Sequence, residues 1–147
     1  MTARTRFVQL ALSKLGSTVL WGANGPEAFD CSGLVLWAMN AAGAKLDDQR
    51  AQDLANACRM LGGEEGPLPG DLLFYGGGWD SVIHVGVWLA GGKALSADGA
   101  TSAVQSLQAA KANERARVRL HDTPVFRRDY LGCSRNTLID AVDKVEN

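Results

Sequence analysis

The stretch FDCSGLVLWAM, residues 29–39, places a cysteine between an aspartate and a Ser-Gly pair, where a polar turn becomes an apolar run. Asp30 suits the position before a helix, because its carboxylate can accept hydrogen bonds from the first backbone N–H groups. Gly43 is a typical helix terminator. The sequence therefore predicts a largely buried helix over residues 31–42, with Cys31 in its first turn.

The position of Cys31 favours a reactive thiol without establishing one. Unpaired N–H groups and the positive end of the helix dipole both favour a thiolate in a first turn. A free cysteine there is also commonly a small buried apolar residue. His84 lies between Ile83 and Val85, where an imidazole is costly unless it is paired or functional. We hypothesise that this strand packs on the helix start and that His84 takes the thiol proton.

Length and composition limit the class of protein. At 147 residues and 46% hydrophobic content, the chain fits one compact domain. A net charge of -1 gives no bulk attraction for nucleic acid or an anionic membrane. Residues 1–16 break their apolar run at Gln9, Ser13 and Lys14, so we expect synthesis in the cytoplasm without a signal peptide and no membrane insertion. Three cysteines without CxxC spacing predict neither a disulfide framework nor a metal site.

The order of predicted elements indicates an α+β domain, because helices come first and antiparallel strands follow. Asp47 or Asp48 is the expected cap of the third helix, which Gly62 ends. The predicted helices cover residues 3–16, 31–42, 48–61, 101–114 and 137–145, and the predicted strands cover residues 72–75, 81–89, 93–97, 116–122 and 125–132.

Four segments together resemble the NlpC-type cell-wall cysteine peptidases, a papain-like family. They are LWGANGPEAFDCSGLVLWAM (20–39), LPGDLLFYG (68–76), IHVGVWLAGGKAL (83–95) and VFRRDYLG (125–132), in family order over roughly residues 7–135. The resemblance implies a papain-like α+β fold, with N-terminal helices packed on a small antiparallel sheet or half-barrel. It implies one peptidase domain over residues 1–135, followed by a helical extension, 136–147, packed on the same domain or on a partner.

The resemblance also implies roles for the residues around the cysteine. Cys31 corresponds to the family's nucleophile and His84 to its base, and the backbone N–H of Cys31 would lie near the developing oxyanion. Asp30 would help to hold the free amine of a stem peptide, and Ser32 would contribute its hydroxyl. Trp21, in the loop before the nucleophile, is a further expected substrate contact.

Two positions depart from the family pattern. A tyrosine is usual where this chain has Val19, which cannot donate a side-chain hydrogen bond. The residue that orients the base is most often a histidine, and the corresponding position here is Ser96. Asp98 would share its strand face and is an equal candidate, and water in this role is a third alternative.

The remaining candidates receive simpler interpretations. Trp79, between three glycines and an aspartate, is expected to be exposed near the cleft and to bind substrate. The others are expected to have no catalytic role: Trp37 and Trp88 as core residues, Cys58 and Cys133 as inert thiols, and His121 as a surface residue.

The resemblance implies a hydrolase of peptidoglycan stem peptides that acts through an acyl-enzyme, commonly at the bond between D-glutamate and a diamino acid or lysine, without a cofactor. A cell-wall amidase is a variant of this reading. Lack of a signal peptide resembles bacteriophage-associated members, so contact with a virion tail or a second copy through the C-terminal helix is a further expectation. Such an enzyme would act on the bacterial wall, in the periplasm. The alternative is a non-catalytic structural or binding module, such as a tail component.

Overall fold

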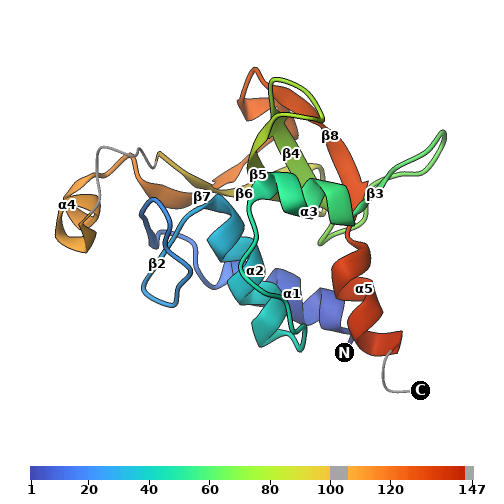
Figure 1. The fold of residues 1–147 in the computed structure, drawn as a ribbon, viewed down its shortest axis with the longest axis horizontal. Helices are drawn as coiled ribbons and strands as arrows, with labels where there is room; N and C mark the ends of the chain where they lie inside the picture. Colours follow the sequence, from blue (N-terminus) through green and yellow to red (C-terminus); the bar gives the residue numbers. More distant parts are fainter. Residues whose placement is uncertain (100–105, 145–147) are drawn as a thin grey trace.

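Three helices dominate the first part of the chain and the longer strands follow them in one largely antiparallel sheet, which confirms the predicted α+β class (Figure 1). The computed structural model describes residues 1–99 and 106–144. The elements are α1 (Ala3–Leu12), β1 (Thr18–Val19), β2 (Ala28–Phe29), α2 (Cys31–Ala41), α3 (Ala51–Ala57), β3 (Arg59–Met60), β4 (Leu72–Gly76), β5 (Val82–Leu89), β6 (Lys93–Asp98), α4 (Leu107–Ala112), β7 (Arg117–His121), the 3-10 turn η1 (Pro124–Phe126), β8 (Tyr130–Arg135) and α5 (Thr137–Lys144).

The strands form one curled half-barrel sheet in the order β2-β1-β7-β6-β5-β4-β8-β3. Its central pairs are antiparallel, and only β1 and β2 run parallel among the pairs described. The β5–β6 hairpin turns at Gly91 and Gly92, whose φ angles of 82° and 76° suit glycine. Because β5, β6 and β7 are neighbours, residues from three strands can meet on one face of the sheet.

The first two helices pack together and cover the sheet. Helix α2 contacts both α1 and β5, so its first turn is held against a central strand. Phe7 of α1, Met39 of α2 and Phe74 of β4 are fully buried in the same core. Burying such side chains stabilises the fold by about 2 kcal/mol each. The core therefore fixes the start of α2 relative to β5.

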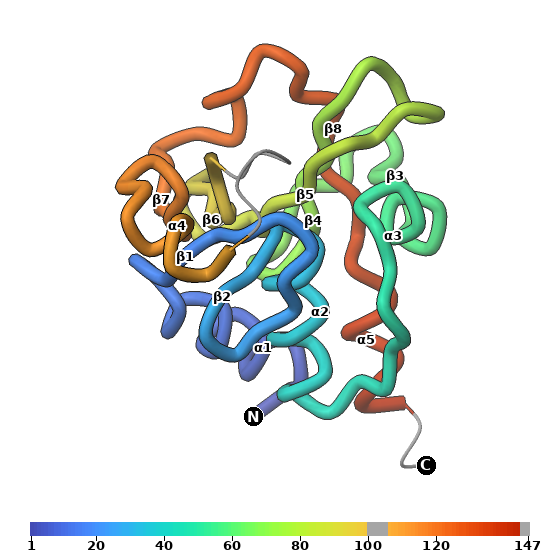
Figure 2. The backbone as a smooth tube through the Cα atoms, turned by 60° about the vertical axis from the view of Figure 1, so that its left-hand side comes forward, coloured from blue at the N-terminus to red at the C-terminus, as the bar shows by residue number. Residues whose placement is uncertain are grey.

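The C-terminal helix α5 packs on the first helix of the same chain. The Arg4 guanidinium donates to both carboxylate oxygens of Asp140, at 2.9 and 2.8 Å. Asp143 accepts hydrogen bonds from the backbone N–H of Ala3. Both ends of the described chain consequently lie on the same side of the molecule (Figure 2).

Several predicted element boundaries are wrong. The first helix ends at Leu12 rather than at residue 16, and Arg59–Met60, predicted as helix, form strand β3. Helix α3 begins after Arg50, because the Asp53 carboxylate accepts from the Arg50 N–H, and not after Asp47 or Asp48. The strand predicted at 125–132 is instead the turn η1 followed by β8, since the proline that opens the turn has no N–H for a ladder. Part of the predicted 101–114 helix lies outside the described residues, and α4 is its described part.

In the described part of the chain, no helix has both the length and the apolar character that a bilayer span needs.

Candidate active site

The turn before α2 is tied to the first turn of that helix by Asp30. One carboxylate oxygen accepts from the Gly33 N–H at 2.6 Å and from the Ser32 hydroxyl at 3.3 Å. The other accepts from the Gly22 N–H at 3.1 Å. A Cβ at Gly33 would lie 2.1 Å from the carbonyl oxygen of Ala23, so only glycine allows this close approach. The helix start that carries the thiol is therefore rigidly built.

Cys31 is the first residue of α2, and its thiol is directed at strand β5. Burial raises the pKa of the Cys31 thiol, and the nearby Asp30 carboxylate acts in the same direction. The backbone N–H of Val85 favours the thiolate and opposes this shift. Because Val85 directly follows His84, the sulfur lies beside the strand segment that carries the imidazole. Burial therefore favours the protonated thiol over the thiolate.

Four polar side chains from β5, β6 and β7 form a continuous hydrogen-bonded series, here called the polar chain: His84, Ser96, Asp98 and His121. The His84 Nε2 atom lies 2.5 Å from the Ser96 hydroxyl oxygen. That hydroxyl donates to Asp98 Oδ1 at 2.6 Å. Asp98 Oδ2 lies 2.5 Å from Nε2 of His121. The sequence offered Ser96 and Asp98 as alternative partners for His84. In the structure Ser96 bonds to His84 and Asp98 bonds to Ser96, so both belong to one series.

The direction of each hydrogen bond in the polar chain follows from what each group can donate. An ionised carboxylate only accepts, so the single hydroxyl proton of Ser96 goes to Asp98. The Ser96 oxygen must then accept from the Nε2–H of His84. This bond selects the tautomer in which Nδ1 of His84 carries no proton, and the described residues supply no hydrogen-bond donor to Nδ1. The polar chain therefore leaves a basic nitrogen available.

Aromatic rings enclose the His84 imidazole. The Tyr75 ring packs edge-on against it, with centroids 5.4 Å apart, and the Tyr75 hydroxyl donates to the Pro124 carbonyl at 2.7 Å. Burial lowers the pKa of His84 to about 3, and the Arg127 guanidinium adds to this effect. The Asp129 carboxylate opposes the shift. His84 is consequently neutral at neutral pH.

Burial disfavours the charged form of both the Cys31 thiol and the His84 imidazole. Within the residues that the structure describes, no hydrogen bond joins the Cys31 sulfur to His84. Both observations disfavour a preformed thiolate–imidazolium pair. Catalysis by this pair would need the proton to move as the sulfur attacks, and such contacts commonly tighten only when substrate is bound.

The structure corrects two expectations for aromatic and imidazole residues. Trp79 is partly buried rather than exposed: its ring packs edge-on against Phe74 at 6.0 Å, and its carbonyl accepts from the Gln52 side chain. His121, expected at the surface, is partly buried and belongs to the polar chain. The available signal for His121 was its place on a strand next to that of Ser96, but the register of the two strands is not visible in the sequence.

The two other loop residues of interest lie in different surroundings. Trp21 is 62% exposed, next to the Gly22 N–H that contacts Asp30, so its ring is accessible beside the helix start. Val19 is 1% exposed and belongs to the core. The position where a tyrosine was expected therefore contributes packing instead of a hydroxyl.

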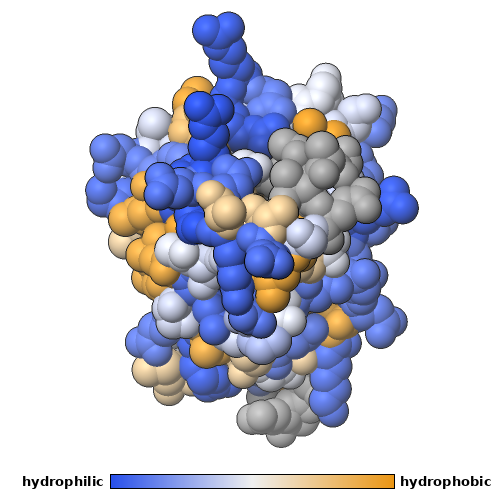
Figure 3. Space-filling view, turned by 90° about the vertical axis from the view of Figure 1, so that its left-hand side faces the viewer, coloured by the Kyte–Doolittle hydropathy of each residue, from blue (hydrophilic) through white to orange (hydrophobic). Residues whose placement is uncertain are grey.

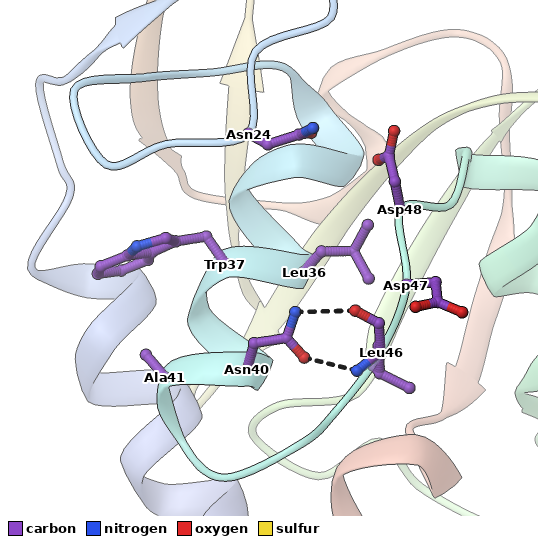
Figure 4. Close-up of a pocket in the computed structure, with 8 residues that line it drawn as sticks. All are labelled: Asn24, Leu36, Trp37, Asn40, Ala41, Leu46, Asp47 and Asp48. Carbon is purple, nitrogen blue, oxygen red and sulfur yellow. Dashed lines mark hydrogen bonds between the residues drawn. The ribbon is translucent and has the colours of Figure 1, made fainter.

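Two cavities flank the site. One of about 380 Å³ runs along the outer side of α2, where Figure 4 shows Asp47 and Asp48 across from Asn24 and the Asn40 amide bonded to the Leu46 backbone. It holds neither the thiol nor the imidazole. A cavity of about 330 Å³ adjoins the polar chain instead, and it is lined by Asp98, Gly99, Phe126 and Arg127. The second cavity is the one next to the candidate chemistry.

The face that carries α4 and β7 is mostly hydrophilic, with several separate hydrophobic groups (Figure 3). Over the described ranges, the His, Cys, Asp and Glu side chains form no group of three or more that could hold a metal ion.

Comparison with known proteins places this geometry in context. The NlpC/P60 family profile matches residues 16–134. The probable endopeptidase p60 of Listeria grayi is 37% identical over 87 residues, which are 59% of this chain and 16% of that protein. The chain thus spans only a small part of this curated relative.

Two solved structures from Mycobacterium tuberculosis share the fold. The peptidoglycan hydrolase RipB is 26% identical, with a TM-score of 0.67 over 92% of this chain and 65% of its own. RipD, described as a non-catalytic NlpC/p60 domain protein adapted to peptidoglycan binding, is 19% identical, with a TM-score of 0.66 over 92% of this chain and 97% of its own. The same fold therefore occurs with and without catalysis.

Proposed function

The chain belongs to the NlpC/P60 family, and we propose that it is a cysteine peptidase that hydrolyses amide bonds in peptidoglycan stem peptides. Cys31 is the nucleophile and His84 is the base. The observation that carries the proposal is the polar chain, because it presents an unprotonated Nδ1 on the strand against which the Cys31 thiol lies. The endopeptidase and hydrolase names of the relatives support the same reaction class.

In the proposed reaction the Cys31 sulfur attacks the carbonyl carbon of the amide while its proton passes to Nδ1 of His84. The C–N bond breaks, and the departing amine takes that proton from His84. A thioester remains on Cys31. Water then attacks the thioester, giving its proton to His84, and the C–S bond breaks as the sulfur regains a proton. The backbone N–H of Cys31 stabilises the oxyanion in both steps.

Ser96 and Asp98 assist by holding and polarising the imidazole. Once His84 accepts a proton it becomes a buried cation, which its low pKa shows to be unfavourable in the resting molecule. The Nε2–H bond to Ser96, and through it the Asp98 carboxylate, stabilises this cation in the transition state. A neutral serine thereby transmits the influence of a carboxylate.

We further propose that the substrate bond joins D-glutamate to a diamino acid or lysine. Asp30 lies at the start of α2 with its carboxylate directed to the loop of Trp21 and Gly22. Its charge suits the free amine of a stem peptide, and the exposed Trp21 ring offers a surface for the neighbouring part of the chain. Ser32, which bonds to Asp30, keeps that carboxylate in place.

A non-catalytic peptidoglycan-binding module is the second candidate. One observation favours it: the Cys31 thiol has a raised pKa and lacks a hydrogen bond to His84 among the described residues. A module of this kind would keep the groove that recognises the stem peptide without cleaving it.

Mass spectrometry of the muropeptides released from purified peptidoglycan separates the two candidates. The wild type is expected to release fragments with a new amine on the diamino acid or lysine, whereas Cys31→Ala and His84→Gln lose activity by about 1000-fold or more. Cys133→Ala, which removes a thiol from β8, is the matched control and stays active. Sedimentation of the wild type with peptidoglycan, without any released fragment, would instead establish the binding module. Equal release by wild type and Cys31→Ala would contradict the proposed nucleophile.

A further inference from the structure

His121 is the last member of the polar chain, and nothing in the four family-like segments assigns it a role. We propose that His121 is a positioning residue for the base: it fixes the Asp98 carboxylate so that Ser96 donates to it and His84 keeps its Nε2–H tautomer. The proposal extends the proposed peptidase mechanism and rests on it for the catalytic consequence. Its structural consequence, the state of His84, can be measured separately.

The two oxygens of Asp98 have different partners, and this division orients the carboxylate. Oδ1 accepts from Ser96 at 2.6 Å, and Oδ2 accepts from His121 at 2.5 Å. A carboxylate held at both oxygens cannot turn about its terminal bond without losing one of them. If the His121 bond is removed, Oδ1 is free to rotate away from Ser96. The Ser96 hydroxyl then gains the freedom to donate to His84, which would reverse the tautomer.

The His121 ring is itself held in a fixed plane. It stacks on Phe126 with ring centroids 3.7 Å apart and an interplanar angle of 3°. The same Phe126 ring packs edge-on near His84, with centroids 6.5 Å apart. One side chain of the η1 turn therefore contacts both imidazoles, at the two ends of the polar chain. This arrangement restricts His121 to the orientation in which its Nε2 faces Asp98.

An ion pair between β6 and the residue that follows β7 shows what an exposed surface contact looks like. Lys93 and Asp122 lie 3.2 Å apart, with side chains 45% and 96% exposed. Such a pair contributes little. By contrast, the side chains of His121 and Asp98 are only 23% and 16% exposed. In the described residues, the basic side chains within ion-pair distance of Asp98 are the imidazoles of His84 and His121, and no lysine or arginine lies that close.

The test compares His121→Leu, His121→Gln and Asp122→Asn with the wild type. The first removes the donor, the second keeps an amide N–H at similar reach, and the third breaks the exposed pair with Lys93 without touching the polar chain. We measure the ring 15N resonances of His84 at neutral pH together with kcat and KM on purified stem peptide.

His121→Leu is expected to move the His84 signals from a single Nε2–H tautomer toward a mixture and to lower kcat about tenfold with little change in KM, within the range of couplings in one hydrogen-bond network. In His121→Gln, most of the Nε2–H tautomer of His84 and most of the wild-type kcat are expected to be kept. Asp122→Asn is expected to have the wild-type His84 signals and the wild-type kcat. When Ser96 is already replaced by alanine, adding His121→Leu should cause no further fall in kcat, because His121 acts through Ser96. A His84 spectrum that is unchanged in His121→Leu would overturn the proposal. So would a fall in kcat on His121→Leu that is the same with Ser96 present and with Ser96→Ala.

His121→Asn provides a second test of the proposal if His121→Leu does not fold. His121→Asn keeps a polar side chain but ends short of Asp98, so it should reproduce the leucine effect while His121→Gln does not. Identical His84 spectra in the asparagine and glutamine variants would overturn the proposal. A wild type that releases no muropeptide would refute the peptidase function, yet the His84 spectra would still decide the role of His121.

Discussion

Two little-exposed carboxylates, Asp71 and Asp98, differ in the partners that surround them. Asp71 is 0% exposed and accepts from the guanidinium groups of Arg4 at 2.9 Å and Arg135 at 3.1 Å. Asp98 is bonded to a hydroxyl and an imidazole. The two arginines, which are always charged, neutralise the Asp71 carboxylate, so Asp71 stabilises the fold by linking separate elements. The Asp98 carboxylate keeps a charge that can act on His84.

The surroundings of Asp71 explain how the ends of the chain are joined. Besides the two arginines, its carboxylate accepts from the backbone N–H groups of Leu68 at 2.8 Å and Asn136 at 3.0 Å. The partners come from α1, from the turn before β4, from the end of β8 and from the residue between β8 and α5. One side chain thus fastens the C-terminal helix to the first helix, far along the chain from the thiol.

The largest effect that distinguishes the two regions is expected for Asp71→Ala. Removing the carboxylate leaves the Arg135 guanidinium without its ion-pair partner and Arg4 with Asp140 alone. It also removes the acceptor of two backbone N–H groups, so the free energy of unfolding should fall by about 5 kcal/mol. Urea denaturation followed by circular dichroism measures the loss. Asp140→Ala is the matched control, because Asp140 also pairs with Arg4 but its side chain is 34% exposed. This change should lower the free energy of unfolding by about 1 kcal/mol or less. Similar losses in the two variants would contradict a special role for Asp71.

In the region of Asp98, the buried His84 should make the free energy of unfolding depend on pH. The folded pKa of His84 is lowered to about 3 from the ordinary value of 6.5, so the unfolded chain binds the proton more readily between these values. Its contribution to stability is present above pH 6.5 and is lost as pH falls toward 3, by up to about 4 kcal/mol. The difference in unfolding free energy between wild type and His84→Gln isolates this contribution from the other groups that titrate. A difference that stays constant over that pH range would refute the lowered pKa.

A smaller effect, confined to activity, is expected for Ser96→Ala. Without the hydroxyl, His84 loses the acceptor for its Nε2–H, and kcat/KM should fall about 100-fold, which corresponds to about 2.7 kcal/mol. Ser134→Ala is the matched control, since Ser134 is equally buried on β8 and its hydroxyl has no partner in the described part of the molecule. That change should leave activity intact. Equal activity of both variants would show that the polar chain does not assist the base.

The helix start and the hairpin could be predicted because their signals are local. Asp30 caps the helix within three residues of Cys31, and the Gly91–Gly92 turn joins neighbouring strands. The antiparallel neighbourhood of His84 and Ser96 follows from that hairpin. These short-range rules were sufficient to bring His84 and Ser96 into one region of the sheet.

The rest depended on contacts between distant parts of the chain. In the register of β6 and β7, His121 lies opposite Ala94 and Arg117 lies opposite Asp98. The contact between His121 and Asp98 therefore depends on how their side chains extend along the sheet. The partial burial of Trp79 depends on Gln52 and on Gly132, whose position lies close to the Trp79 ring. The order of Ser96 and Asp98 depends on their side-chain rotamers, which a strand pattern does not specify.

The central claim is that His84 serves Cys31 as its base, and the alkylation rate of each cysteine by iodoacetamide tests it most directly. Burial raises the pKa of Cys58 and of Cys133 to about 12, so both are internal references. At pH 7 Cys31 is expected to react fastest, and His84→Gln should slow Cys31 about tenfold or more while the other two keep their rates. A Cys31 rate that is the same in wild type and His84→Gln would contradict the account.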